Sequence, residues 1–347
     1  MKKKLKTWFK WSSLVLLLLA GFAAWIVYQW VYKPNVNLKE SRYFYIATGS
    51  DYDEVFHDLK DQAIISDPVS FDRVARKKEY PAKVKPGRYK IKPGMSNNEL
   101  VNLLRSGLQE PVLVTFNNIR FKDQLAGRVC RNLEADSTEL LRLMNDSVYL
   151  KKEFGLKPTN IMSLFIPNSY EFYWNTSPEQ FLKRMAKEYK AFWTEERKKK
   201  AKEIGLSQTE VSVLASIVQC EQQYFNDEKK IIAGLYINRL KKNHPLESDP
   251  TLMFAHGNFS MKRVLNIHKE IESPYNTYKN KGLPPGPITL PEISSLDAVL
   301  YYTPNNYFFM CAKDDFSGRH YFSVNYSEHL KYARMYKKAL DKRGIKQ

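Results

Sequence analysis

The sequence predicts an α+β protein with one apolar N-terminal helix, a small α+β module and a mainly helical remainder that contains a β-hairpin. Three observations predict this class: a long uncharged stretch near the N-terminus, short alternating runs typical of strands, and longer segments whose apolar residues recur every three or four positions. With 347 residues, of which 43% are hydrophobic, the chain can form about two domains of roughly 150 residues with buried cores.

The N-terminal segment predicts a membrane-spanning helix. Residues 1–33 contain six lysines and no acidic residue, and residues 11–32 carry no charge. As a helix this stretch would extend about 33 Å, enough to cross the hydrocarbon core of a bilayer. A cleaved signal peptide is the alternative, because small residues occur at 20–24, but the apolar stretch is longer than a signal region and has aromatic residues near both ends. The lysines predict a single-pass protein of the cytoplasmic (inner) membrane, with residues 34–347 facing the periplasm or exterior.

The charge balance points to an anionic partner outside the cell. The formal net charge is +18, and +12 remains without residues 1–33. An outside location argues against nucleic acid and favours an anionic envelope surface or polymer. The three cysteines form no CxxC pair, and HExxH, GxGxxG and P-loop motifs do not occur in the sequence, so we expect no cofactor and no metal.

The remainder of the chain divides into a short module and a longer helical part. A connector at 34–39 reads as a stalk, and strands are expected at 43–47 and 87–91. Ser96 and Glu99 form a capping box that predicts a helix start. Later elements are a helix at about 178–202, a capped helix after Ser207, a helix at about 228–242, a hairpin of 307–312 with 320–323, and a basic helix from Ser327. The expected organisation is 1–33 as cytoplasmic N-terminus and transmembrane helix, 34–111 as linker and module, and 112–347 as one large domain.

The helix after Ser207 carries a candidate acid. Glu221 follows Leu214, Ile217 and Val218 by seven, four and three residues, so it shares their apolar face. Burial disfavours a charged carboxylate and raises its pKa, which lets a glutamic acid hold a proton near neutral pH and donate it. A surface or salt-bridged glutamate is the alternative on periodicity alone.

Several polar segments follow this helix. Asn238 faces the apolar side of its helix, and inward polar groups need partners or a ligand. Asp249 is expected to cap a helix that begins at Pro250. Residues 273–278 and the Gly/Pro-rich stretch 282–287 predict a rigid, exposed loop whose hydroxyl and amide groups suit a sugar groove; an ordinary surface loop is the alternative.

These segments resemble, in order and spacing, the MltG (YceG-like) family of endolytic murein transglycosylases. The resemblance rests on residues 214–221, 237–240, 248–251, 273–278 and 282–288. It extends to residues 85–89 and 93–96, which match the family's LysM-like module, and to residues 165–172 and 320–322. The resemblance therefore implies a LysM-like module at 34–111 and a YceG-like catalytic domain at 112–347.

The resemblance also implies a reaction. A membrane-anchored lytic transglycosylase of this family cleaves peptidoglycan strands internally, between MurNAc and GlcNAc, and leaves 1,6-anhydroMurNAc ends. Glu221 matches the catalytic acid, which protonates the glycosidic oxygen and then accepts the proton of the MurNAc C6 hydroxyl. The family's preceding glutamate is Gln219 here. Peptidoglycan glycan strands, the cytoplasmic membrane and, as a family expectation, peptidoglycan synthases are the implied partners.

Other residues are candidates for holding the sugar chain. The candidate substrate-binding residues are Gln219, Asn238, Arg239, Asp249, Thr251, Tyr275, Asn276 and Tyr278. The histidines show no ligand spacing; His320 and His329 are placed either near the site or at the surface. Two other functions remain open: hydrolysis, with Asp249 as a second carboxylate positioning water, and a membrane-anchored glycan-binding scaffold without turnover.

Overall fold

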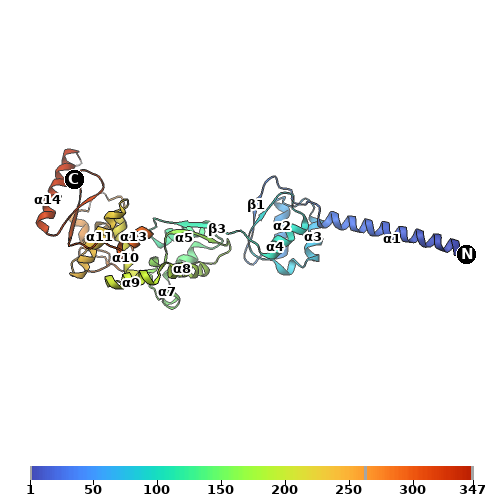
Figure 1. Ribbon diagram of the computed structural model, residues 1–347, viewed down its shortest axis with the longest axis horizontal. Helices are drawn as coiled ribbons and strands as arrows, with labels where there is room; N and C mark the ends of the chain where they lie inside the picture. Colours follow the sequence, from blue (N-terminus) through green and yellow to red (C-terminus); the bar gives the residue numbers. More distant parts are fainter. Residues whose placement is uncertain (1, 262–263, 345–347) are drawn as a thin grey trace. The chain divides into compact units, whose positions relative to one another are not determined.

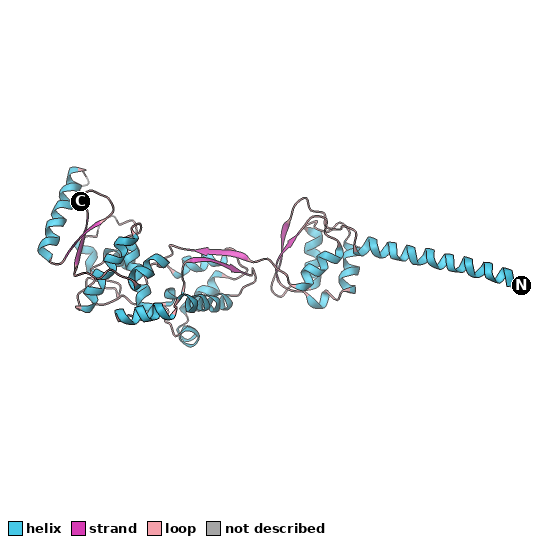
Figure 2. Cartoon of the chain, in the orientation of Figure 1, coloured by secondary structure: helices cyan, strands magenta, loops and turns pink. Residues whose placement is uncertain are grey.

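The computed structural model describes residues 2–261 and 264–344 and confirms a mostly helical α+β protein with small two-stranded sheets (Figure 1, Figure 2). The chain forms two compact units. The first comprises residues 1–113, 132–134 and 171–176, and the second comprises the other residues.

The first helix is long and apolar. Helix α1 spans Lys2–Val31, and its segment Trp11–Val31 has the length and composition of a membrane span, consistent with an anchor or a signal sequence. Large apolar side chains along it are exposed, including Leu16, Leu17 and Leu18. Such a surface needs an apolar environment such as lipid.

The rest of the first unit is a small α+β module. Its main elements are β1 (Arg42–Ile46), α2 (Tyr52–Asp61), α3 (Pro68–Lys77), the 3-10 helix η1 (Pro81–Lys83), β2 (Gly87–Ile91) and α4 (Asn97–Ser106). Strands β1 and β2 are antiparallel, with Phe44 opposite Tyr89, and both of these side chains are buried in the module core. The predicted capping box of Ser96 and Glu99 is confirmed at the start of α4.

The connector before β1 is part of this module and not a free stalk. Pro34 forms an isolated bridge with Ser96, and Val36 forms one with Ile65. Val36 is also buried in the module core. The stalk prediction is therefore wrong, because a segment without helical period still pairs its backbone with neighbouring chain.

The second unit contains most of the helices. Its elements, with strands β3 and β4 shared at their outer ends, are β3 (Val112–Phe116), α5 (Lys122–Cys130), α6 (Ser137–Asn145), α7 (Ser147–Phe154), η2 (Ile161–Leu164), β4 (Asn168–Phe172), α8 (Pro178–Phe192), α9 (Glu195–Ile204), α10 (Gln208–Glu221), α11 (Asn226–Lys241), α12 (Asp249–His256), η3 (Asn266–Glu270), α13 (Ile293–Leu300), β5 (Phe309–Ala312), β6 (His320–Ser323) and α14 (Tyr326–Lys342). The hairpin β5–β6 is confirmed, with Phe309 opposite Ser323.

Three predicted boundaries need correction. The helix expected at 178–202 is two helices, because Trp193 ends α8 and Thr194 accepts a hydrogen bond from the Arg197 backbone to cap α9. Helix α12 is capped by Ser248 and not by Asp249, so it begins one residue earlier than expected. Helix α14 begins at Tyr326, because Asn325 caps it.

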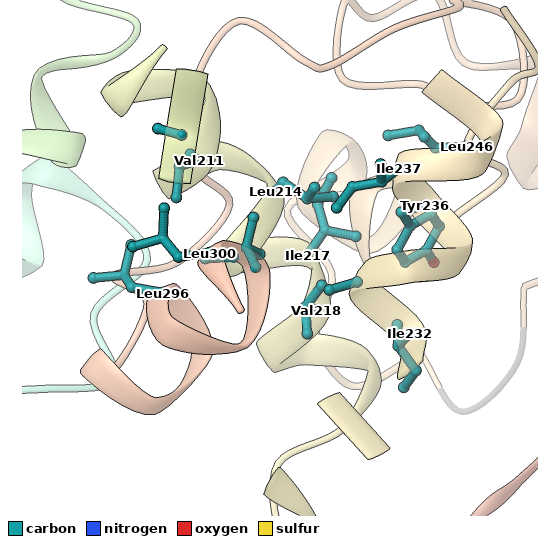
Figure 3. Close-up of a cluster of buried hydrophobic side chains, with 14 of the residues drawn as sticks. Val211, Leu214, Ile217, Val218, Ile232, Tyr236, Ile237, Leu246, Leu296 and Leu300 are labelled. Carbon is teal, nitrogen blue, oxygen red and sulfur yellow. The ribbon is translucent and has the colours of Figure 1, made fainter. Parts of the chain in front are cut away.

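Helix α10 is the centre of the second unit. Every residue from Val211 to Gln219 is buried, and the neighbouring elements α11 and α13 supply the facing apolar side chains. Figure 3 shows Leu214, Ile217 and Val218 of α10 among this cluster. Because α10 is covered on nearly all sides until its last turn, its C-terminal residues have a fixed position in the core.

Candidate active site

A cavity of about 430 Å³ lies at the C-terminal end of α10. Its walls come from α10, α11, α12, the hairpin and the start of α14, all in the second unit. The lining residues are Glu221, Leu235, Tyr236, Arg239, Leu246, Glu247, Asp249, Lys269, Tyr278, Phe309, Met310, Cys311, Ala312, His320, Tyr326 and His329.

Glu221 is held at the inner wall of this cavity by two hydroxyl groups. The Tyr236 hydroxyl donates to Glu221 Oε1 at 2.7 Å, and the Ser248 hydroxyl donates to the same oxygen at 2.6 Å. Among the described residues no donor or acceptor contacts Oε2, and this oxygen is not a buried atom. Oε2 is therefore the carboxyl oxygen that can carry a proton toward a ligand.

The surroundings of Glu221 favour its protonated form. Burial of the carboxyl group raises its pKa most strongly, and the negative charge of Asp249 raises it further. The hydrogen bonds from Ser248 and Tyr236 and the charge of His320 act in the opposite direction without cancelling the effect of burial. A glutamic acid with a raised pKa can donate a proton near neutral pH and accept one afterwards.

A second carboxyl group, that of Asp249, lines the same cavity. The Tyr278 hydroxyl donates to Asp249 Oδ1 at 2.6 Å. Burial raises the pKa of Asp249, although this hydrogen bond and the charge of Lys269 act against it. Tyr278 and Asp249 thus form a polar wall whose hydroxyl and carboxyl groups can contact a sugar.

Arg239 lines the cavity, and its Nε and Nη1 donors are engaged by neighbouring protein groups. Its Nε donates to Phe308 O at 2.6 Å. Its Nη1 donates to Pro245 O, Leu246 O and Glu247 Oε2. Because these contacts join α11 to the hairpin and to the loop before α12, the guanidinium shapes the cavity wall.

Four polar side chains among the predicted site residues lie outside the cavity lining. Gln219 accepts a hydrogen bond from Glu292 N at 2.6 Å and donates to Leu290 O. Asn238 donates to the backbone oxygens of Asn305 and Tyr307, and Thr251 donates to Ser248 O. Asn276 donates to the backbone of Lys269 and Ile271 and accepts from Tyr278 N. These groups, of which Asn238 is half-buried and the others are buried, provide hydrogen-bond partners for the backbone around the site.

Tyr275 and the Gly/Pro-rich stretch also lie away from the lining. The Tyr275 ring packs against Phe254 at 4.7 Å between ring centres. Within the stretch 282–287, positions 284, 286 and 287 are buried, so the prediction of an exposed loop is wrong for these positions. Gly286 explains the burial, because a Cβ at this position would overlap the backbone oxygen of Thr159.

Sequence reasoning missed Tyr236, Glu228 and Lys269, and it assigned Ser248 no role at Glu221. Tyr236 falls on the buried stripe of α11 and looks like a core aromatic residue. The only signal for Ser248 is its place beside Asp249 in a matched motif. Among residues 2–261 and 264–344, groups of three or more His, Cys, Asp or Glu side chains that could hold a metal ion are not found.

The fold and the cavity define a class: a mostly helical α+β protein whose candidate active site centres on one partly desolvated acid. The chain belongs to the YceG-like family, whose sequence profile matches residues 44–335. This confirms the resemblance inferred from the motifs.

Relatives of the chain carry a functional name. It is 29% identical to the endolytic murein transglycosylase of Bacillus subtilis (strain 168), over 88% of this chain and 85% of that protein. It is 27% identical to the endolytic murein transglycosylase of Streptococcus pneumoniae serotype 2, over 92% of this chain and 63% of that longer protein. A yceG-like protein from Listeria monocytogenes has a similar structure, with a TM-score of 0.55 and 27% identity over 85% of this chain and 99% of the other.

Proposed function

We propose that the chain is a membrane-anchored endolytic lytic transglycosylase of peptidoglycan, with Glu221 as its single general acid and base. The observation that carries this proposal is the carboxyl group of Glu221, which has a raised pKa and one unengaged oxygen in a polar cavity. Membership of the YceG-like family and the names of its relatives support peptidoglycan as the substrate.

The proposed reaction has two proton transfers. Protonated Glu221 gives its proton to the glycosidic oxygen between MurNAc and GlcNAc as the bond to C1 breaks. The resulting carboxylate then takes the proton of the C6 hydroxyl of the same MurNAc, and O6 closes on C1. The products are a GlcNAc end and a 1,6-anhydroMurNAc end, and Glu221 is protonated again.

The hydroxyls of Tyr236 and Ser248 suit the intermediate stage of this reaction. Both donate to Oε1, so they stabilise the carboxylate that exists between the two transfers and leave Oε2 to carry the proton. Asp249 and Tyr278, in the same wall, are proposed to bind the sugar chain.

The apolar helix α1 supports a location at the cytoplasmic membrane. In this proposal α1 is an uncleaved single-pass anchor, and residues 34–347 reach the glycan strands on the outer side. The small module, proposed to be LysM-like, and a coupling to peptidoglycan synthases in the same membrane are family expectations.

Hydrolysis is a second candidate, because Asp249 lies in the same cavity as Glu221. An acid and a second carboxylate that positions water are the usual requirement of a glycosidase. The two reactions differ in their products: transglycosylation leaves an end that is one water lighter than the hydrolysed end.

The deciding experiment is mass analysis of products from purified glycan strands. The full chain in detergent, Glu221→Gln and the surface control Glu203→Gln are compared. We expect anhydro ends from the wild type and the control, and a rate lower by about 10²- to 10⁴-fold for Glu221→Gln. Hydrolysed ends that disappear in Asp249→Asn would replace the proposal with hydrolysis. Strand binding without any cleavage by the wild type would support the scaffold function.

A further inference from the structure

A buried carboxylate behind the cavity holds one of the cavity's side chains. The His320 Nδ1 lies 2.7 Å from Glu228 Oε1, and the His320 backbone N–H donates to Glu228 Oε2 at 3.3 Å. The Glu228 side chain is only 4% exposed, and that of His320 is 16% exposed. His320 lines the cavity that contains Glu221, whereas Glu228 does not.

Gln222 fixes this pair to the end of α10. Its Nε2 donates to Glu228 Oε1 at 2.8 Å and to Gly318 O at 2.9 Å. Its Oε1 accepts from the backbone of Tyr224 and Phe225. One buried amide, adjacent in sequence to Glu221, therefore connects α10, the start of α11 and the hairpin that carries His320.

Glu228 has a nearby cation as well as hydrogen-bond donors. Arg319 Nη1 lies 3.7 Å from Glu228 Oε2 and 2.8 Å from Asp227 Oδ2. A buried charge is costly unless it is paired and hydrogen-bonded, and Glu228 has both kinds of partner. Arg319, Gln222 and His320 therefore hold the Glu228 side chain in one position.

The geometry decides which imidazole nitrogen is available. A carboxylate only accepts hydrogen bonds, so the Nδ1 of His320 carries the hydrogen that faces Glu228. Nε2 has no hydrogen-bond partner among the described residues and is not a buried atom. His320 and Glu221 line the same cavity, so a ligand bound there can contact both side chains.

We propose that His320 is a substrate-contacting residue that hydrogen-bonds a hydroxyl or acetamido group of an aminosugar polymer through Nε2, and that Glu228 and Gln222 are positioning residues for its imidazole. This inference rests on the proposed function. A carboxylate that orients a histidine ring and fixes its tautomer is a recurring arrangement in enzyme sites.

The competing explanation is that the contact between Glu228 and His320 only stabilises the fold. Two substitutions distinguish this explanation from a contact with substrate. In His320→Asn the amide can still donate to Glu228 in place of Nδ1, but no atom reaches the position of Nε2. In His320→Gln the amide reaches toward the Nε2 position and gives up the contact near the ring's Nδ1. The exposed His57 on α2, in the other unit, provides the control His57→Asn.

The first measurement is kcat and KM for cleavage of purified glycan strands, with thermal unfolding of each variant. We expect His320→Asn to lose about tenfold or more in kcat/KM at an unchanged midpoint, the size of one lost hydrogen bond to substrate. His320→Gln should retain more activity than His320→Asn, and His57→Asn should match the wild type. Wild-type kcat/KM in a folded His320→Asn would overturn the proposal.

The second measurement separates this inference from the proposed function. Affinity for the same strands is compared in Glu221→Gln with and without His320→Asn, where chemistry does not contribute. A fall of about tenfold in affinity supports the contact even if the wild type fails to cleave, and equal affinity together with unchanged kcat/KM overturns it. If His320→Asn unfolds, Glu228→Gln is tested in the same assays; unchanged kcat/KM and affinity there would overturn the positioning role.

Discussion

Replacing Ser248 by alanine tests whether the hydroxyl groups around Glu221 set its proton affinity. The Ser248 side chain is fully buried and donates to Glu221 Oε1 at 2.6 Å. Although Ser248 is the N-cap of α12, its side chain makes no capping hydrogen bond. The substitution therefore removes a donor to the carboxyl group and leaves the helix start unchanged.

The magnitude follows from the difference between two hydrogen bonds. A hydrogen bond to a charged group contributes about 1.5–3 kcal/mol, and one to a neutral group contributes about 0.5–1.5 kcal/mol. The charged form of Glu221 therefore loses about 1–1.5 kcal/mol more than the neutral form, which corresponds to about one pKa unit. Because the Ser248 hydrogen bond lowers the pKa of Glu221, its loss should raise that pKa further.

Stability should respond with a defined sign. The folded pKa of Glu221 lies above its ordinary value, so protonation favours the folded state. The stabilisation is complete below the ordinary glutamate pKa of about 4.3 and is lost as the pH rises through the folded pKa. Ser248→Ala should therefore lower the free energy of unfolding more at neutral pH than at pH values near 4.

The assay is the pH dependence of strand cleavage by the full chain. In the proposed mechanism cleavage needs protonated Glu221, so its rate should fall as the pH rises through the pKa of that group. Ser248→Ala should move this decline upward by about one pH unit. Ser295→Ala is the matched control, because the Ser295 hydroxyl is buried and has no hydrogen-bond partner among the described residues. A decline that stays in place or moves to lower pH would refute the reasoning.

Two further predictions concern the framework of the site. Gln219→Ala should lower the free energy of unfolding by about 1–3 kcal/mol, because it leaves the Glu292 N–H without its acceptor. The pH profile of cleavage should not move in this variant. A moved profile would mean that Gln219 takes part in the chemistry. Gly286→Ala should strongly lower the midpoint of thermal unfolding, because its Cβ would overlap Thr159 O. The control Gly127→Ala, at an open helical position of α5, should stabilise the folded protein by about 0.5–1 kcal/mol. Equal midpoints for the two variants would contradict this packing.

The regular elements of this chain could be predicted from local sequence. The capping boxes of Ser96 and Ser207 and the hairpin β5–β6 depend on residues a few positions apart, and all three are confirmed. The break between α8 and α9 escaped prediction because the charged residues after Trp193 are good helix formers and include no glycine or proline, so only the cap at Thr194 marks the new start.

The candidate site was also predicted only in part from the sequence. Periodicity placed Glu221 on the apolar face of its helix, because neighbours three and four residues apart share a face. Periodicity could not show whether an inward-facing amide contacts a ligand or the protein backbone. In the structure the side-chain amides of Gln219 and Asn238 form hydrogen bonds with backbone groups.

The sequence by itself determined the apolar N-terminal helix, the helical framework, the family motifs and one acid on a buried stripe. Only the tertiary structure decided which groups contact that acid and which histidines line its cavity. Tyr236 and Ser248 contact Glu221 from 15 and 27 residues away, and Glu228 holds His320 across 92 residues. Local periodicity describes neighbours within one element, whereas these contacts exist because the packing of α10, α11, α12 and the hairpin brings distant side chains together.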